Sequence, residues 1–167
     1  MNTFEVRLWS LRNVFLLWLV RPKVLELTED RCVIRVPLNW ITRRRDIHAM
    51  YLGVLCMGAD VAAGLIGFDL LRRRKARVSF IFKDIKGEFL KRAEGDVQFT
   101  NDDGPLIRSL VERALASGER EEATVHVTAT VPKKLGDEPV ARFELTLSVK
   151  KQASGLGPRA SGGGPEA

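Results

Sequence analysis

The sequence predicts an α+β protein in which an antiparallel β-sheet wraps around one long central helix. The segment 48–68 is apolar on every side, and several later segments alternate between apolar and polar residues. A helix that is hydrophobic all round must be enclosed, and alternating strands offer one apolar face that can enclose it. A twisted sheet can curl around a single helix, and a second copy of the chain is the simplest cover for the side that the sheet leaves open.

The predicted central helix, 48–68, carries a single charged side chain, Asp60, and is rich in glycine and alanine. Glycine is a poor helix former, so its repeated use indicates that other elements approach the backbone closely. The segment is long enough for a membrane span, but Asp60 would then lie deep in lipid. We therefore expect a buried core helix.

Strand patterns lie on both sides of this helix. A short strand, 32–38, is expected before it, followed by a polar loop over 39–47. Period-2 alternation indicates a sheet with one covered face. The strands expected after the helix are 77–82, 88–99, 122–131 and 142–150.

Two further helices are predicted. The segment 4–20 has apolar residues at helical spacing and stops before Pro22. We expect it to pack on the domain; the alternative is a helix on a membrane surface, since its apolar face is rich in Trp, Phe and Leu. The segment 103–118 reads as a helix capped by Asp103 and ended by Gly118.

The expected organisation is an N-terminal helix over 1–22, one domain over 23–151 and a tail over 152–167. The tail is rich in Gly, Pro and Ser and has almost nothing to bury, so we expect it to be disordered. The whole chain of 167 residues fits one ordinary domain.

The basic surplus is local. The net charge is +6, and residues 31–75 alone hold nine basic and three acidic side chains, mainly in the runs 43–45 and 72–75. Such clusters suit a phosphate-bearing ligand or an anionic surface, and the alternative is two solvated loops flanking a helix. Aromatic residues do not interleave with these runs, so nucleic acid is not an expected partner.

Several classes of chemistry have no sequence support. The two cysteines, Cys32 and Cys56, lie among apolar residues and suggest a reduced, cytoplasmic protein. No cysteine and histidine cluster has metal-ligand spacing, so no metal is expected. The serine hydrolase motif Gly-x-Ser-x-Gly is absent. The apolar run 14–20 is too short to span a bilayer and lacks a signal-peptide cleavage site.

Two motifs stand out in the sequence. The first is Tyr51-Leu52-Gly53, with Asp60 seven residues after Gly53. The second lies within residues 83–96 and contains Phe-Leu-Lys-Arg-Ala. They resemble two motifs of the hotdog-fold PaaI-like acyl-CoA thioesterase superfamily, in an uncharacterised branch. The superfamily has His-Gly-Gly followed by an acid at the first, and Phe-Leu-Arg-Pro-Ala at the second. The likeness covers about residues 20–150.

The resemblance implies a homodimer or dimer of dimers that cleaves an acyl-CoA thioester at the subunit interface. Coenzyme A would be part of the substrate, with its phosphates held by basic residues, and no other cofactor is implied. The chain departs from the superfamily at three positions: Tyr51 replaces the His, Leu52 replaces the first Gly, and Asp46 falls where the superfamily has an Asn.

Thioester hydrolysis needs hydrogen-bond donors for the carbonyl oxygen and a base or nucleophile for the carbonyl carbon. The Leu52 and Gly53 N–H groups are the candidate donors, with Tyr51 beside them, and Asp60 is the candidate base or nucleophile. Asp60 lies about 10 Å further along the helix, so we expect it to serve the site of a partner chain. The alternative is a buried carboxylate with no catalytic role, paired with an arginine or capped by backbone N–H groups. The predicted substrate-binding residues are Asp46, His48, Phe89, Arg72, Arg73 and Arg74.

The function expected from these residues is acyl-CoA thioester hydrolysis in the cytoplasm. One alternative is a non-catalytic protein that binds acyl-CoA or acyl carriers. The other is a basic protein that docks on a membrane or on nucleic acid, with peripheral membrane contact through residues 4–20.

Overall fold

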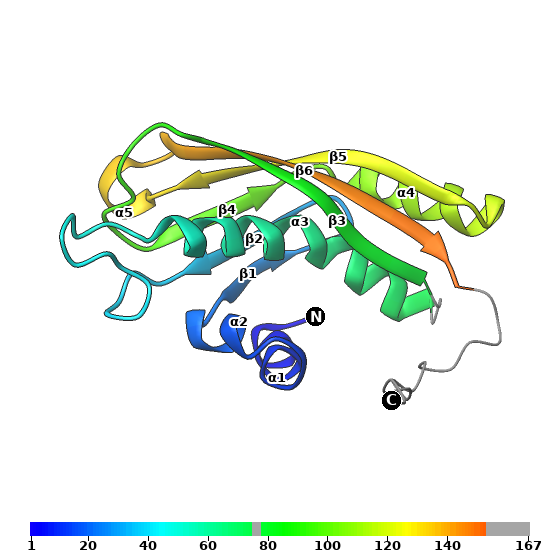
Figure 1. Cartoon of the computed structure of the whole chain (residues 1–167), viewed down its shortest axis with the longest axis horizontal. Coiled ribbons are helices and arrows are strands. Elements are labelled where there is room, and N and C mark those ends of the chain that lie inside the picture. The colour runs from blue at the N-terminus through cyan, green and yellow to red at the C-terminus, as the bar shows by residue number, and fades with distance from the viewer. Residues whose placement is uncertain (75–77, 153–167) are drawn as a thin grey trace, which may run out of the picture.

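The computed structural model describes residues 1–74 and 78–152, and it shows six antiparallel strands curved around one long helix (Figure 1). This is the predicted α+β architecture. The predicted disordered tail lies outside the described residues from position 153 onward. In chain order the elements are α1 (Thr3–Asn13), α2 (Phe15–Val20), β1 (Lys23–Leu27), β2 (Cys32–Val36), α3 (Leu52–Arg74), β3 (Val78–Phe89), β4 (Val97–Asn101), α4 (Gly104–Ser117), β5 (Arg120–Thr130), α5 (Pro132–Leu135) and β6 (Pro139–Lys151).

The sheet has the strand order β1-β2-β4-β5-β6-β3, so β1 and β3 are its two edges. The predicted alternation is confirmed in β5 and β6, where Val125 pairs with Leu145 and Val127 pairs with Phe143. All four side chains are buried. Because successive residues of a strand point to opposite faces, one face of the sheet is apolar and covers α3.

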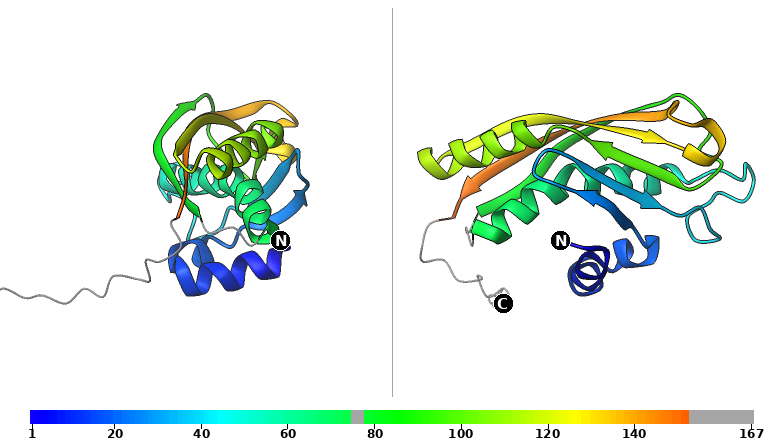
Figure 2. Two further views of the ribbon diagram at one scale, coloured as in Figure 1. Left: turned by 90° about the vertical axis from the view of Figure 1, so that its right-hand side faces the viewer. Right: turned by 180° about the vertical axis from the view of Figure 1, so that it is seen from behind.

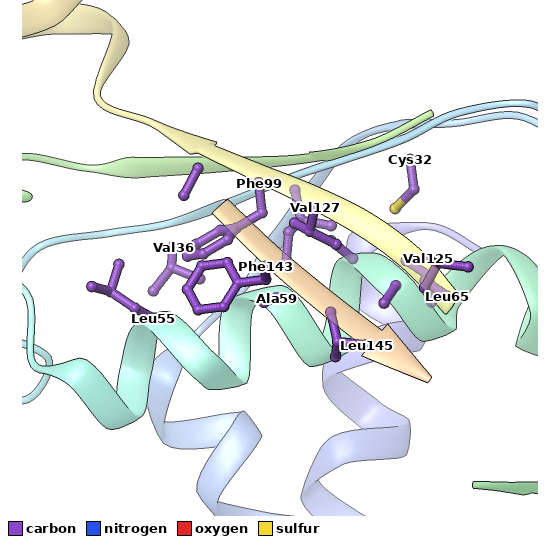
Figure 3. Close-up of a cluster of buried hydrophobic side chains, with 14 of the residues drawn as sticks. Cys32, Val36, Leu55, Ala59, Leu65, Phe99, Val125, Val127, Phe143 and Leu145 are labelled. Atoms are coloured by element: carbon purple, nitrogen blue, oxygen red, sulfur yellow. The ribbon is translucent and has the colours of Figure 1, made fainter. Parts of the chain in front are cut away.

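The helix α3 runs along the hollow of the sheet and supplies the centre of the core (Figure 2). Figure 3 shows Leu55 and Ala59 of this helix beside Phe99 and Phe143 of the sheet. The helix is long and apolar enough to cross a membrane, but most of its apolar length is buried inside the protein. It is therefore the core helix, as predicted.

The glycines of α3 allow the close approach that the sequence predicts. At Gly67 a Cβ atom would lie 2.6 Å from the ring of Phe80 on β3. No side chain fits in that space without moving the ring, so glycine lets β3 pack directly on the helix backbone.

The start of α3 was predicted wrongly, because the helix begins at Leu52 rather than at position 48. His48 has a left-handed φ of 53°, and Arg43 and Met50 form an isolated β-bridge. These residues make a tight turn, and a left-handed residue ends any helical continuation. The described helix extends to Arg74, beyond the predicted end.

The single strand predicted over 88–99 is two strands, since β3 ends at Phe89 and β4 begins at Val97. Between them Ala93 is buried, and its carbonyl accepts a hydrogen bond from the Met50 N–H (2.9 Å). This carbonyl therefore bonds to the loop before α3 and not to a neighbouring strand. The strand β1 and the short helix α5 had no sequence prediction.

The N-terminal helix is also divided, because α1 and α2 are separated at Val14. Each helix buries one side against the body of the protein: Val6 and Ser10 from α1, and Leu17 and Val20 from α2. Figure 2 shows the two helices on the side of α3 that β5 and β6 leave open.

The helix α4 matches its prediction closely and ends at Gly118, whose φ of 73° favours glycine. Asp103 precedes this helix, but its side chain does not cap it. The Asp103 carboxylate instead accepts a hydrogen bond from the His126 backbone N–H (2.7 Å) and lies 2.9 Å from Nδ1 of the His126 ring. The expected side-chain cap is therefore wrong, and Asp103 ties α4 to β5.

Candidate functional site

The first turn of α3 presents free backbone donors. The N–H groups of Val54 and Leu55 both donate to the Tyr51 carbonyl (2.9 and 3.1 Å). The N–H groups of Leu52 and Gly53 make no hydrogen bond to another group in the described part of the chain. Free N–H groups at a helix start carry a partial positive charge and can stabilise an oxyanion.

Hydrogen bonds from two distant segments hold this helix start in place. The Tyr51 N–H donates to the Thr42 carbonyl (2.9 Å), and the Met50 N–H donates to the Ala93 carbonyl (2.9 Å). Thr42 is itself buried, and its hydroxyl donates to the carbonyl of Pro37 (2.8 Å), just after β2. The donors of α3 are therefore fixed to the sheet on both sides, which is the preorganisation that an oxyanion site requires.

Tyr51 stands where the superfamily has a histidine, and its ring covers Gly53. A Cβ atom at position 53 would lie 2.7 Å from Cε1 of Tyr51. The Tyr51 side chain is 53% exposed, so it also borders solvent at the helix start. Glycine at position 53 is what allows the ring to lie against the helix backbone.

A hollow of about 370 Å³ opens at the start of α3, lined by apolar and basic side chains. Leu52 and Phe89 are among the apolar ones. Arg44, Lys91 and Arg92 are basic, and we call these three residues the basic rim. Lys91 and Arg92 had no predicted role. They follow Phe89 and Leu90 in the second family-like motif, which is the signal that could have identified them.

Asp60 lies two turns further along α3, half-buried and without a neutralising partner. Its carboxylate makes no hydrogen bond or ion pair with any described residue, so the alternative of an arginine-paired Asp60 has no support in residues 1–74 and 78–152. Burial raises the pKa of Asp60 above the usual aspartate value. A raised pKa brings a carboxylate closer to the range that suits a general base.

Two hollows meet at Asp60. An open groove of about 380 Å³ runs beside β3, with Cys56, Ile85 and Asp60 among its lining residues. A second pocket of about 370 Å³ lies between α3, β3 and the N-terminal helices, and Asp60 lines it too. The carboxylate is therefore accessible from two sides.

The structure does not bring Asp60 next to the donors of its own helix. From Gly53 to Asp60 the helix rises about 10 Å. Within one chain the candidate donors and the carboxylate are therefore separate, and Leu52 and Asp60 line different hollows.

The predicted substrate-binding residues lie in three places. Phe89 lines the hollow at the helix start. His48 is exposed in the turn before α3, and Asp46 is exposed and paired with Arg44 (2.5 Å). The hydrogen bond from Arg44 lowers the pKa of Asp46. Neither Asp46 nor His48 lines the hollow at the helix start.

The three arginines Arg72, Arg73 and Arg74 lie at the opposite end of α3, roughly 30 Å from the helix start. Each is paired with an acid: Glu5 with Arg72 (3.1 Å), Asp69 with Arg73 (2.7 Å) and Glu112 with Arg74 (2.9 Å). The pairs of Arg72 and Arg74 attach the end of α3 to α1 and α4, and the pair of Arg73 with Asp69 lies within α3. A role for the arginines in phosphate binding stays a prediction.

The cysteines do not have the surroundings of reactive thiols. Burial raises the pKa of Cys32 to about 12 and also raises the pKa of Cys56. A thiol with a raised pKa is a poor nucleophile at neutral pH. Within residues 1–74 and 78–152, no group of three His, Cys, Asp or Glu side chains could hold a metal ion.

Comparison with known proteins identifies the family of the chain. The chain matches the family described as "Domain of unknown function (DUF4442)" over residues 12–149. No match is found among curated proteins.

Solved structures give the fold. A protein of unknown function from Pseudomonas aeruginosa, called a probable thioesterase, is 20% identical, with a TM-score of 0.74 over 91% of this chain and 97% of that one. A thioesterase from Haemophilus influenzae is 12% identical, with a TM-score of 0.65 over 90% of this chain and 92% of that one. A protein of unknown function from Chlorobaculum tepidum is 8% identical, with a TM-score of 0.76 over 90% of this chain and 94% of that one. The sheet around α3 is thus the hotdog fold of thioesterase-like proteins, and the chain belongs to the DUF4442 family.

Proposed function

We propose that the protein hydrolyses acyl-CoA thioesters at the interface of a homodimer in the cytoplasm. The observation that carries the proposal is one helix with the Leu52 and Gly53 N–H groups at its start and the Asp60 carboxylate two turns later, all without a partner among residues 1–74 and 78–152. These are the two kinds of group that acyl transfer requires.

The proposed reaction uses both groups. The thioester carbonyl oxygen accepts hydrogen bonds from the Leu52 and Gly53 N–H groups of one chain. Asp60 of the other chain takes a proton from water while the water oxygen bonds to the carbonyl carbon. The tetrahedral intermediate then loses the thiolate of coenzyme A, and the proton on Asp60 passes to that sulfur. The products are a carboxylic acid and a free thiol.

The edge strand β3 supports the proposed dimer. Ile85 pairs in register with Leu145, and Phe89 with Ala141, so both point toward the covered face of the sheet. Their partners on β6 are buried, yet Ile85 is 43% and Phe89 is 45% exposed. A second copy that pairs along β3 would cover these side chains. If the two α3 helices then run antiparallel, the Asp60 of one chain approaches the helix start of the other.

The basic rim at the helix start suits the phosphates of coenzyme A. Arg44, Lys91 and Arg92 line the same hollow as Leu52, the first of the two candidate donors. A thioester bound at these donors would place its coenzyme A portion near the rim, where phosphates would find cations.

A panel of acyl-CoA substrates tests the proposal. We expect Asp60→Asn to lower kcat by about 10² to 10⁴-fold, the usual contribution of a general base. Asp102→Asn is the matched control, because Asp102 is exposed, is paired with Arg31 (3.1 Å) and lines neither of the two hollows that Asp60 borders. Equally low turnover in wild type and Asp60→Asn would refute hydrolysis. It would favour the non-catalytic acyl-CoA or acyl-carrier binder, because Tyr51 and Leu52 stand where the superfamily has His and Gly.

The outer surface of α1 and α2 supports a second role, peripheral contact with an anionic membrane. Phe4, Leu8, Leu11 and Phe15 follow one another at helical spacing, and all four are exposed. Arg7, Arg12, Arg21 and Lys23 accompany them, against the single acid Glu5. An apolar stripe with basic neighbours is typical of helices that lie in the surface of an anionic bilayer.

A further inference from the structure

The pocket between α3 and the N-terminal helices is distinct from the hollow at the start of α3. It has a volume of about 370 Å³ and lies between α1, α2, α3 and β3. Trp9 and Leu17 come from the N-terminal helices, Val61 and Leu65 from α3, and Phe80 from β3. Figure 1 shows α1 and α2 below α3. These short helices form the outer wall of the pocket, which we call its roof.

The chemistry of its lining selects an apolar ligand. Asp60 is the one charged side chain among the described residues that line the pocket. The hydroxyl of Ser10, which also lines it, already donates to the carbonyl of Val6 (2.8 Å). The amino group of Met1, another lining residue, pairs with Asp69 (2.8 Å). The Asp60 carboxylate is the one charged side chain of the lining and has no partner among residues 1–74 and 78–152. The pocket therefore fits a hydrocarbon chain whose polar end lies at Asp60.

The pocket and the groove beside β3 meet at three shared residues, Met57, Asp60 and Phe82. A ligand that crosses this junction would keep its polar group in the groove, where the second chain is proposed to lie. We propose that the pocket holds the acyl chain of the thioester substrate, and that its length selects medium or long chains. This inference rests on the proposed function, since it assigns the acyl part of the same substrate.

The volume sets an approximate chain length. At ~30 Å³ for each methylene, about the share of one water molecule in the liquid, the pocket has room for on the order of ten carbons. Gly64 helps to create this room, because its α-carbon borders the pocket without a side chain. A Cβ atom there would lie 3.4 Å from the Phe82 ring, which is an ordinary contact. Alanine thus fits at position 64, and a larger side chain would enter the pocket.

The experiment measures binding separately from hydrolysis. Acyl-CoAs with 4, 8, 12 and 16 carbons are titrated calorimetrically into the full chain carrying Asp60→Asn, which is expected not to turn over. Affinity should rise by about fourfold for each added methylene until the pocket is full, since each buried methylene contributes a similar amount. Equal affinity for the 4-carbon and 12-carbon ligands would overturn the inference.

A filled pocket supplies the second test. In the same background, Gly64→Leu should weaken binding of the 12-carbon ligand by at least tenfold and affect the 4-carbon ligand far less, while Gly64→Ala, which removes less room, should have a smaller effect than Gly64→Leu. Val61→Phe is an alternative plug if Gly64→Leu does not fold. Equal loss for both ligands would overturn the inference. Chain-length-dependent binding in a wild-type protein that never cleaves the thioester would refute the hydrolase and leave the acyl pocket standing.

Discussion

The ring of Phe99 on β4 lies directly against the α-carbon of Gly58 on α3. A Cβ atom at position 58 would lie 2.3 Å from two ring carbons, and Phe99 is completely buried. Gly64, on the same helix, faces the ring of Phe82 with more space, since its Cβ atom would lie 3.4 Å away. The two glycines therefore differ in what an added methyl group would meet.

We expect Gly58→Ala to lower the free energy of unfolding by about 1–3 kcal/mol, the usual effect of overpacking a core. Gly64→Ala should be neutral or raise it by up to ~1 kcal/mol, because alanine favours the helix. Urea unfolding followed by circular dichroism measures both. Equal effects of the two substitutions would show that the Phe99 ring moves away and that position 58 tolerates a side chain.

Asp60 should cost the protein stability at neutral pH. Burial raises the pKa of its carboxyl in the folded state, so the folded state loses stability as the pH rises from the unfolded value through the folded one. Asp60→Asn removes this loss, and we expect its thermal midpoint at pH 7 to exceed that of the wild type by roughly 2–4 °C. The difference should shrink as the pH falls through the folded pKa and vanish well below the ordinary aspartate pKa of about 3.9, where the carboxyl is protonated in both states. A less stable variant at pH 7 would mean that Asp60 has a favourable partner in the assembled protein.

The fold could be predicted because its main elements carry unambiguous patterns. The alternation over 122–131 and 142–150 specifies one apolar face, and 48–68 is apolar on every side, so enclosure is the only arrangement that buries both. The strand β1 escaped prediction because exposed and half-buried residues do not alternate along Lys23–Leu27. Its place depends on pairing with β2, which no local pattern shows.

The candidate site could be predicted only in part, for a similar reason. The seven-residue spacing between Gly53 and Asp60 is visible in the sequence, but the start of α3 depends on long-range hydrogen bonds such as the one from Met50 to Ala93. The pocket beside Asp60 depends on where α1 and α2 pack. Tertiary contacts set both features, and periodicity within one segment does not report them.

The free N–H group of Leu52 can be removed without removing the helix. Proline is well tolerated at the first helical position, where its missing N–H is not needed by the helix. We expect Leu52→Pro to lower kcat by roughly 10² to 10³-fold, the usual contribution of one oxyanion donor. Leu52→Ala is the matched control, since it shortens the same exposed side chain and keeps the N–H. Equal activity of the two variants, with equal melting temperatures, would exclude this N–H group from the reaction.

The two edges of the sheet allow a test of the dimer. Ile85 on β3 and Leu25 on β1 are similarly exposed. We expect Ile85→Glu to convert the dimer into a monomer in light scattering after gel filtration, because a buried unpaired carboxylate at an interface is costly. Leu25→Glu should leave the dimer intact. Dissociation by Leu25→Glu alone would place the interface at the β1 edge and separate Asp60 from the partner's helix start.

The apolar stripe of α1 and α2 should carry any membrane contact. We expect wild-type protein to sediment with vesicles of phosphatidylserine and phosphatidylcholine, and to do so less as salt rises, since anionic lipid attracts the basic side chains. The double variant Leu8→Glu and Phe15→Glu should lose most of this binding, because it places two acids in the stripe and leaves the buried Val6 and Leu17 in place. Leu25→Glu, at an exposed position on the edge strand β1 outside the stripe, controls for added charge. Binding that persists in the double variant would contradict a membrane role of the stripe. If the wild-type protein does not bind vesicles, α1 and α2 serve only as the roof of the acyl pocket.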